Sequence, residues 1–313
     1  MTPFRLKAPC KDYLWGGEKL RAYGKISDAD RIAESWELSC HPDGESIVMD
    51  GESAGRTLSA VLAEHPEAMG EHCRKFDRFP VLVKLIDAKD DLSVQVHPDD
   101  AYALAHEGEY GKTEMWYIVE AAPDAELIYG FRENITKEEF RRAIEENSFL
   151  DKVNRVPVQK GDVFFIEAGT LHAIGKGILI AEIQQNSNTT YRVYDYGRVG
   201  ADGKPRDLHI EKALDVTTLT PAKQQVRLPQ TGSTQLLAQC RYFCAVCMEV
   251  ETFTQMRTDS TSFLHMLVLE GNAVLKLGDF QLPLQKGTSV FVPAGTGAFR
   301  IIGKCKFIST TIQ

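Results

Sequence analysis

Long hydrophobic runs are missing from this sequence of 313 residues. A membrane-spanning helix needs about 18 or more consecutive apolar residues, and no stretch of that length occurs. The first twenty residues contain four cations but no apolar segment of the kind that a secretory signal carries. We therefore expect a cytoplasmic protein with no membrane partner.

Paired cysteine motifs are also scarce. The seven cysteines form an odd, scattered set, which indicates reduced thiols rather than a disulfide framework. Cys244 and Cys247 have the spacing of a metal-binding knuckle, but no second Cys-x-x-Cys accompanies them, and both lie in the apolar run Tyr242–Val250. The pair therefore favours a buried strand over a metal site.

An excess of positive charge is absent too. Lysine and arginine number 36 against 44 aspartates and glutamates, which gives a net charge of −8. Because nucleic acids and membrane surfaces are anionic, neither is an expected partner. A small anionic ligand remains compatible with this balance, since salt screens charges beyond about 8 Å and a local group of cations can outweigh the overall sign.

Helices are few, and short strands dominate the pattern. Runs rich in β-branched and aromatic residues are separated by Gly, Pro, Asp and Asn, which is typical of barrels and sandwiches. Strands are predicted over Ile47–Met49, Val81–Ile86, Leu92–His97, Met115–Val119, Val163–Glu167, Ile178–Gln184, Tyr242–Val250, Leu264–Leu269, Ala273–Leu277 and Ser289–Val292. Helices are predicted over Leu58–His65, Asp99–His106, Thr136–Leu150 and Leu208–Leu214, and Thr136 and Glu139 have the spacing of a capping box.

An internal repeat indicates a duplicated barrel. Residues 160–172 match residues 286–298, because each segment begins with Lys-Gly, continues as an apolar strand and reaches Ala-Gly-Thr at the same offset. An apolar strand ending in glutamate precedes each copy, and we match Met115–Glu120 with Met266–Glu270. The copies differ where chemistry would lie, since Ala298 replaces His172 and no acidic residue beside Met266 corresponds to Glu114.

This repeat predicts two domains. Residues 1–230 would form a metal-bearing catalytic domain with helical segments, and residues 231–313 a smaller second domain that lacks the metal ligands. The segment Val216–Leu236, rich in Pro, Gln, Ser and Gly, is the expected linker between them.

Four polar side chains form a candidate metal site. Side chains alternate between the two faces of a strand, so Gln95 and His97 share a face. Glu114 opens a second strand, and His172 follows the turn after a third. Two imidazoles, one carboxylate and one amide oxygen suit Zn²⁺ with water completing its coordination. Spacing alone leaves this site and ordinary core histidines about equally supported.

Several motifs occur in a fixed order along the chain. They are Leu14-Trp-Gly-Gly-Glu-Lys-Leu20, Glu34-Ser-Trp-Glu-Leu-Ser39, Gln95-Val-His-Pro98, Lys112-Thr-Glu-Met115, Ala168-Gly-Thr-Leu-His172 and Tyr191-Arg-Val-Tyr-Asp-Tyr-Gly-Arg198. Together they resemble the type I mannose-6-phosphate isomerases, zinc enzymes of the cupin superfamily. The likeness runs from about Pro3 to His209 and continues weakly to the end. The chain resembles the compact bacterial form of that family, because it has no room for the large helical insertion of longer members.

The resemblance implies a mainly β fold of two cupin-type (jelly-roll) barrels, with a few short helices inserted in and packed beside the first. It also implies the reversible isomerisation of mannose 6-phosphate and fructose 6-phosphate, with that sugar phosphate as the partner and one Zn²⁺ per chain. In that family the residues that match Gln95, His97, Glu114 and His172 bind the zinc.

Further site residues follow from the same resemblance. Arg192 matches an arginine at the reacting centre, and Lys84 and Lys112 match lysines of the same pocket. Ser93 and Arg198 match residues that contact the phosphate. Longer members carry lysine at the position of Arg198, within a motif of different sequence, so this sequence departs from them at the phosphate contact.

Moving a carbonyl group between C1 and C2 requires a proton carrier and fixed positive charge beside the enediol oxygens. Zn²⁺ and Arg192 suit the second role. We favour Glu182 as the proton carrier. Its rivals are Lys84, Lys112 and Asp195, and an equal alternative is a Glu182–Arg192 ion pair that only orients the arginine. Asp195 and Trp15 are also expected to line the substrate pocket.

Two other functions fit some of the same residues. His97, Glu114 and His172 alone match the two-histidine, one-carboxylate site of non-haem Fe(II) oxygenases, although Gln95 and the nearby cations argue against that reading. A sugar-binding cupin without catalysis is the second alternative, and it would exchange no solvent protons into bound sugar phosphate. The sequence selects no oligomeric state.

Overall fold

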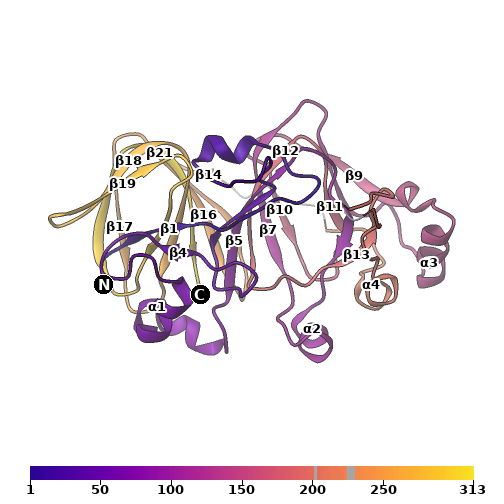
Figure 1. The fold of residues 1–313 in the computed structure, drawn as a ribbon, viewed down its shortest axis with the longest axis horizontal. Coiled ribbons are helices and arrows are strands. Elements are labelled where there is room, and N and C mark those ends of the chain that lie inside the picture. The colour runs from indigo at the N-terminus through magenta and orange to yellow at the C-terminus, as the bar shows by residue number, and fades with distance from the viewer. Residues whose placement is uncertain (201–202, 224–229) are drawn as a thin grey trace.

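Three antiparallel β-sheets form the framework of the protein, and the prediction of a mainly β protein is confirmed (Figure 1). The computed structural model describes residues 1–200, 203–223 and 230–313. The six-stranded sheet contains β2 (Cys10–Lys11), β3 (Glu34–Leu38), β5 (Val81–Ala88), β7 (Glu114–Ala121), β10 (Val163–Ile166) and β12 (Ile178–Gln185). The five-stranded sheet contains β6 (Val94–Val96), β8 (Glu126–Phe131), β9 (Val153–Pro157), β11 (His172–Ile174) and β13 (Tyr191–Tyr194).

The third sheet has ten strands and draws on both ends of the chain. It contains β1 (Phe4–Lys7), β4 (Ile47–Val48), β14 (Gln230–Thr231), β15 (Thr234–Gln239), β16 (Cys244–Val250), β17 (Phe253–Thr258), β18 (Leu264–Leu277), β19 (Phe280–Gln285), β20 (Ser289–Val292) and β21 (Gly297–Thr311). We call the six- and five-stranded sheets together the first barrel and the ten-stranded sheet the second barrel. The apolar run around Cys244 and Cys247 is strand β16, and both thiols are free.

The helices are short, as the sequence predicts. The α-helices are α1 (Leu58–Glu64), α2 (Asp100–His106), α3 (Lys137–Glu145) and α4 (Ile210–Val216), and the 3₁₀ helices are η1 (Lys19–Tyr23), η2 (Pro66–Met69), η3 (Glu71–Lys75) and η4 (Phe149–Asp151). The expected capping box starts α3, because the Thr136 side chain accepts from Glu139 N at 3.1 Å and the Glu139 carboxylate accepts from Thr136 N at 2.9 Å. No helix among the described residues has the length and apolar character needed to cross a bilayer.

Four hydrophobic clusters show how the layers pack. One cluster lies between the six- and five-stranded sheets, and a second joins the outer face of the five-stranded sheet to α3 and α4. A third cluster packs the other face of the six-stranded sheet against the ten-stranded sheet and α1. The fourth fills the interior of the second barrel. Strands β5 and β12 read as nearly continuous apolar runs because both of their faces are buried.

The repeat is visible in the strand order. Neighbouring strands run β10-β7-β12-β5 in the first barrel and β20-β18-β21-β16 in the second. The register corrects our sequence match by one residue. Phe165 pairs with Met115, whereas its repeat counterpart Phe291 pairs with His265, so Met266 corresponds to Trp116 and not to Met115. Both barrels thus use the same four-strand frame.

The two ends of the chain meet in one sheet. Strand β1 pairs with β20, and β4 pairs with β1. In Figure 1 these indigo strands lie among the yellow strands of the C-terminal region. A boundary at residue 230 therefore assigns β1 and β4 to the first domain, although both strands belong to the ten-stranded sheet of the second barrel. Residues 224–229 of the predicted linker lie outside the described residues.

Candidate active site

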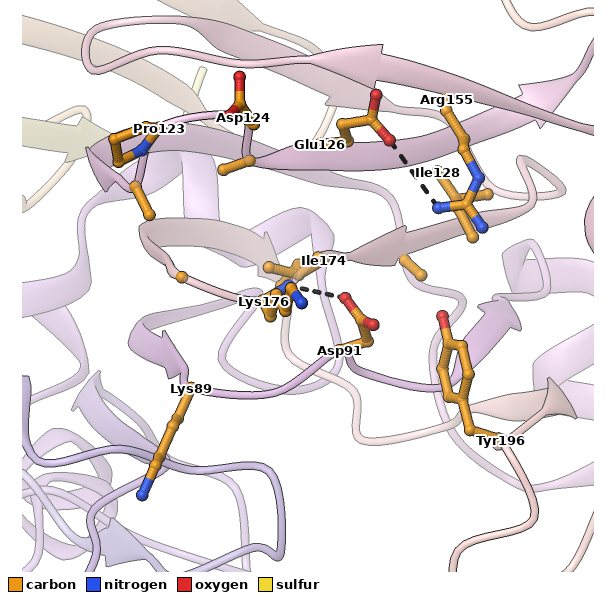
Figure 2. A pocket seen from close by; sticks show the side chains of 15 residues that line it. Lys89, Asp91, Pro123, Asp124, Glu126, Ile128, Arg155, Ile174, Lys176 and Tyr196 are labelled. Atoms are coloured by element: carbon orange, nitrogen blue, oxygen red, sulfur yellow. Dashed lines mark hydrogen bonds and ion pairs between the residues drawn. The ribbon is translucent and has the colours of Figure 1, made fainter.

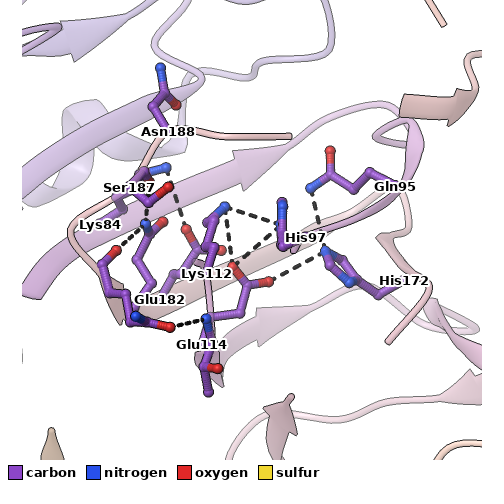
Figure 3. A network of polar contacts seen from close by, with 12 residues as sticks. Lys84, Gln95, His97, Lys112, Glu114, His172, Glu182, Ser187 and Asn188 are labelled. Atoms are coloured by element: carbon purple, nitrogen blue, oxygen red, sulfur yellow. Dashed lines mark hydrogen bonds and ion pairs between the residues drawn. The ribbon is translucent and has the colours of Figure 1, made fainter. Parts of the chain in front are cut away.

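Three buried side chains from three strands converge inside the first barrel. His97 follows β6, Glu114 opens β7 and His172 opens β11. His97 Nε2 lies 3.6 Å from Glu114 Oε2, and His172 Nε2 lies 3.4 Å from Glu114 Oε1. One ligand atom from each residue lies within 4.8 Å of the others, and all three side chains are buried. This geometry is that of a candidate metal site (Figure 3).

The backbone fixes how both imidazoles are turned. Nδ1 of His97 lies 2.9 Å from the Thr189 carbonyl oxygen, and Nδ1 of His172 lies 2.8 Å from that of Thr170. Because a carbonyl only accepts, each Nδ1 carries the proton and each Nε2 presents its lone pair to Glu114. Burial lowers the pKa of both rings, that of His172 to about 4, so both are neutral at physiological pH. Neutral imidazole is the form that binds metals.

The carboxylate of Glu114 also fits a cation. Neither of its oxygens accepts a well-directed hydrogen bond from any described residue, although Lys112 Nζ lies 3.2 Å from Oε2. Burial and the neighbouring Glu182 raise the pKa of Glu114 to about 8. The ionised form therefore needs compensating positive charge, and a divalent cation between Glu114 and the two Nε2 atoms would supply it.

Gln95 reaches the same point from β6. Its backbone pairs with His172 across the β6–β11 ladder, and its side-chain amide ends 3.4 Å from His172 Nε2. A turn of the amide would bring its oxygen to that place, since the oxygen and nitrogen are interchangeable by a flip. The four predicted metal ligands thus lie together (Figure 3).

A second cluster of buried charge lies beside the metal candidate. Lys84 and Glu182 are register partners on β5 and β12, and Lys84 Nζ lies 3.4 Å from Glu182 Oε1 and 3.6 Å from Glu34 Oε2. Trp116 Nε1 donates to Glu182 Oε2 at 2.9 Å. Burial lowers the pKa of Lys84, but Glu34 and Glu182 together raise it above its usual value. Lys84 is therefore protonated at neutral pH.

A cavity of about 270 Å³ opens beside these two clusters. Gln95, Lys84, Lys112 and Glu182 line it together with the predicted residues Ser93, Arg192 and Trp15. Arg192 Nε donates to Ser93 Oγ at 3.2 Å, and its Nη1 donates to the Asp207 carbonyl at 2.9 Å. The alternative ion pair between Glu182 and Arg192 is not found among these contacts, because Glu182 pairs with Lys84 instead.

Two predicted residues lie just outside the lining of this cavity. Asp195 accepts a bidentate contact from Arg206, at 2.7 Å to Oδ2 and 2.5 Å to Oδ1, and also pairs with Arg198. Arg198 donates onward to the Asp91 carbonyl and is not among the residues that line the cavity. Arg206 is the arginine of this triad that lines the cavity.

Sequence reasoning missed five polar lining residues: Tyr13, Glu34, Asn188, Thr190 and Arg206. Glu34 had a signal, because it opens the Glu-Ser-Trp motif and alternation puts it on the face of Trp36, whose Nε1 donates to it at 2.8 Å. Trp36 itself is fully buried beneath Lys84. Arg206 had no such signal, because it lies in an irregular segment without the sequence periodicity of a strand or a helix.

A larger cavity, of about 480 Å³, lies elsewhere (Figure 2). It shares Ile174 with the smaller cavity, but none of the metal candidates lines it. Its charged residues are of both signs, among them Lys89 and Lys176 against Asp124 and Glu126. Size therefore does not identify the site here, and the converging ligands do.

The interior of the first barrel turns two neutral imidazoles and a buried carboxylate toward one point, which defines a β-barrel protein with a candidate metal site. Comparison with known proteins narrows this class. The family model "Phosphomannose isomerase type I, catalytic domain" matches residues 3–133, and "Mannose-6-phosphate isomerase, cupin domain" matches residues 233–312. The chain belongs to the type I phosphomannose isomerase family, which confirms the resemblance seen in its motifs and the predicted cupin fold.

Individual relatives cover the whole chain. It is 40% identical over 311 residues to mannose-6-phosphate isomerase ManA of Bacillus subtilis, with 98% of each chain covered. It is 39% identical to mannose-6-phosphate isomerase of Streptococcus mutans, again with 98% of each covered. The crystal structure of mannose 6-phosphate isomerase from Bacillus subtilis matches with a TM-score of 0.92 at 37% identity over 99% of both chains.

Proposed function

We propose that this protein interconverts mannose 6-phosphate and fructose 6-phosphate at a zinc ion held by Gln95, His97, Glu114 and His172. The observation that carries the proposal is the convergence of these four side chains beside a cavity lined by cations. Relatives that match the full chain carry the name of this activity. Nitrogen and oxygen ligands at a protein-enclosed site suit zinc. When bound there, zinc supplies positive charge beside the sugar oxygens at which the enediol develops negative charge.

Glu182 is our proton carrier. Burial raises the pKa of Glu182, but Lys112 and Lys84 outweigh burial and lower it below its usual value, so the carboxylate is ionised and can accept a proton. In the proposed reaction a Glu182 oxygen takes the proton from C2 of mannose 6-phosphate and returns it to C1, while the O2 hydroxyl proton passes to O1, so that the aldehyde becomes a hydroxyl and C2 becomes the ketone. Lys84 is a weaker candidate because it is protonated, and Asp195 because two arginines occupy it.

The remaining cations have separate roles in this proposal. Lys84 and Lys112 lie on the metal side of the cavity, where they stabilise charge on the enediol oxygens. Arg192 has its guanidinium held by Ser93 and by the Asp207 carbonyl, so its charge keeps a fixed orientation toward the substrate. Trp15 forms a wall of the cavity.

Ser93 and Arg206 are the proposed phosphate contacts. Both line the cavity, whereas Arg198 donates to Asp91 and Asp195. Asp195 holds Arg206 by two hydrogen bonds and orients it. Our sequence expectation for Arg198 thus becomes an indirect role, in which this arginine steadies Asp195. Arg206→Ala should raise KM for mannose 6-phosphate more than for mannose, and Arg198→Ala should do so less.

The direct test is a coupled assay with mannose 6-phosphate before and after chelation of the metal. We expect turnover that is lost on chelation and restored by zinc in preference to iron. Solvent deuterium should enter C2 of recovered mannose 6-phosphate in the presence of the enzyme. Oxygen consumption with bound iron and no isomerisation would instead indicate an oxygenase. Binding without deuterium exchange would indicate a non-catalytic cupin.

A further inference from the structure

One tyrosine from the C-terminal region reaches a carboxylate at the start of α2. Tyr242 precedes β16, and its hydroxyl donates to Asp100 Oδ2 at 2.7 Å. The other oxygen of Asp100 accepts from Gln185 Nε2 at 2.7 Å and from Gly111 N at 2.9 Å. Asp100 therefore joins three segments that lie far apart in the sequence: the C-terminal region, the loop before β7 and the end of β12.

Gln185 carries this connection to the candidate active site. Its side-chain oxygen accepts from Thr113 N at 2.8 Å, and its own backbone N–H donates to the Thr113 carbonyl at 3.1 Å. Both backbone polar groups of Thr113 are thus held by one residue. Thr113 lies between Lys112 and Glu114, two of the side chains that surround the metal candidate.

The position of Thr113 sets where its two neighbours point. Lys112 Nζ lies 3.2 Å from both Glu114 Oε2 and His97 Nε2, so a small backbone displacement would change each of these contacts. The hydrogen bond from Gln185 Nε2 to Asp100 fixes which end of the amide faces Thr113 N, because the nitrogen end only donates and the oxygen end only accepts. Hydrogen bonds to a carboxylate are among the stronger ones in proteins.

We propose that Tyr242 and Asp100 are positioning residues for the reaction. They act through Gln185 to fix the segment Lys112–Glu114, so the C-terminal region takes part in building the active site of the first barrel. This inference rests on the proposed function, because it assigns Lys112 and Glu114 to catalysis and metal binding. The inference requires no direct contact between the substrate and the C-terminal region.

The experiment compares Tyr242→Phe, Asp100→Ala and a matched control. Tyr102→Phe is the control, because the Tyr102 hydroxyl also donates to an aspartate, Asp215, at 3.3 Å, but in an exposed position. For each purified zinc enzyme one measures kcat and KM for mannose 6-phosphate, the rate of zinc loss to a chelator and the melting temperature. Outer contacts of metal sites change affinity or activity by about 10–100-fold, and this link is one step more remote, so we expect about a fivefold lower kcat for Tyr242→Phe.

Asp100→Ala should have the larger effect, about 10-fold or more in kcat, because Gln185 and Gly111 also lose their acceptor. Zinc should leave both variants faster than the wild type, with KM changed less than twofold and the control unchanged. In an Asp100→Ala background, Tyr242→Phe should add nothing. If Asp100→Ala does not fold, Tyr242→Phe alone, which removes only one hydroxyl group, still tests the inference.

Two outcomes would overturn the inference. One is a Tyr242→Phe enzyme whose kcat and zinc-loss rate equal those of Tyr102→Phe. The other is independent, additive loss in the double variant, which would mean that the two residues act separately. Zinc loss is measured without substrate. An inactive wild type would therefore refute the proposed function, while the zinc-loss rates would still test the link.

Discussion

The two barrels share a strand frame but differ in what fills it. In the first barrel the interior side chains of β5, β7 and β12 include charged residues, whereas the interior of the second is an apolar cluster. Because Met266 corresponds to Trp116, the ladder positions can be matched directly. Glu114, Glu182, Lys84 and His172 of the first barrel correspond to Leu264, Ser309, Val246 and Ala298 of the second.

The four-strand frame therefore does not require the buried charged residues of the candidate active site, because the second barrel has the same strand order with an apolar interior. Buried charges cost several kcal/mol each to desolvate unless partners compensate them, and the first barrel compensates Lys84 with Glu34 and Glu182. The second barrel instead packs Phe299 and Phe307 with aliphatic residues, which is stabilising without partners. The first barrel therefore has less hydrophobic stabilisation in its interior but carries the charged residues of the site, and the second barrel keeps an apolar interior.

The strongest way to break the comparison is Glu114→Leu, which gives the first barrel the residue found at that position in the second. We expect loss of bound metal and a fall in kcat/KM of at least about 10³-fold, because a carboxylate ligand and the charge stabilisation at the metal are both lost. Metal analysis and the coupled assay check this. A folded variant that keeps one zinc per chain would contradict it.

Glu182→Gln separates the proton carrier from the metal. The amide keeps the shape and the Trp116 contact but cannot take a proton, so kcat should fall by about 10²–10⁴-fold while zinc content stays at one per chain. KM should change little. Near-normal turnover would remove Glu182 as the base and return attention to Lys112.

The reverse exchange, Leu264→Glu, places a carboxylate among the apolar side chains that fill the second barrel. It should lower the free energy of unfolding by about 3–5 kcal/mol, since an uncompensated charge is then buried. The activity of folded protein should stay near the wild-type value, because the change lies outside the first barrel. Urea denaturation measures the loss, and Leu264→Met, which should cost less than about 1.5 kcal/mol, is the control.

The smallest expected effect concerns acid stability at the packing face between the barrels. Burial lowers the pKa of His265 to about 3, while an unfolded histidine has a pKa near 6.5. Between these values only the unfolded chain binds the proton, so stability falls with decreasing pH by about 1.4 kcal/mol per unit. His265→Gln should flatten the decline of unfolding free energy from pH 6.5 to 5 by about 2 kcal/mol. Equal slopes for the two proteins would contradict this assignment.

Motifs with a period could be predicted from the sequence. Alternation placed Gln95 and His97 on one face, and the repeated segments by themselves predicted two related barrels. The one-residue error at Met266 arose because two apolar segments of similar composition can be aligned in either of two registers. Only the backbone pairing in the structure shows which register is correct. Arg206 and Tyr242 could not be found, because irregular segments and contacts between distant segments leave no local pattern.

The pairing of β1 with β20 links one of the earliest strands to emerge during synthesis with one of the latest. Until both are present, β20 has a free hydrogen-bonding edge, and such edges recruit strands from other molecules. A fragment of residues 231–313 expressed alone would lack β1 and β4 and would therefore tend to self-associate. A peptide spanning residues 1–50 should insert beside β20 and suppress that association, as a donor strand does.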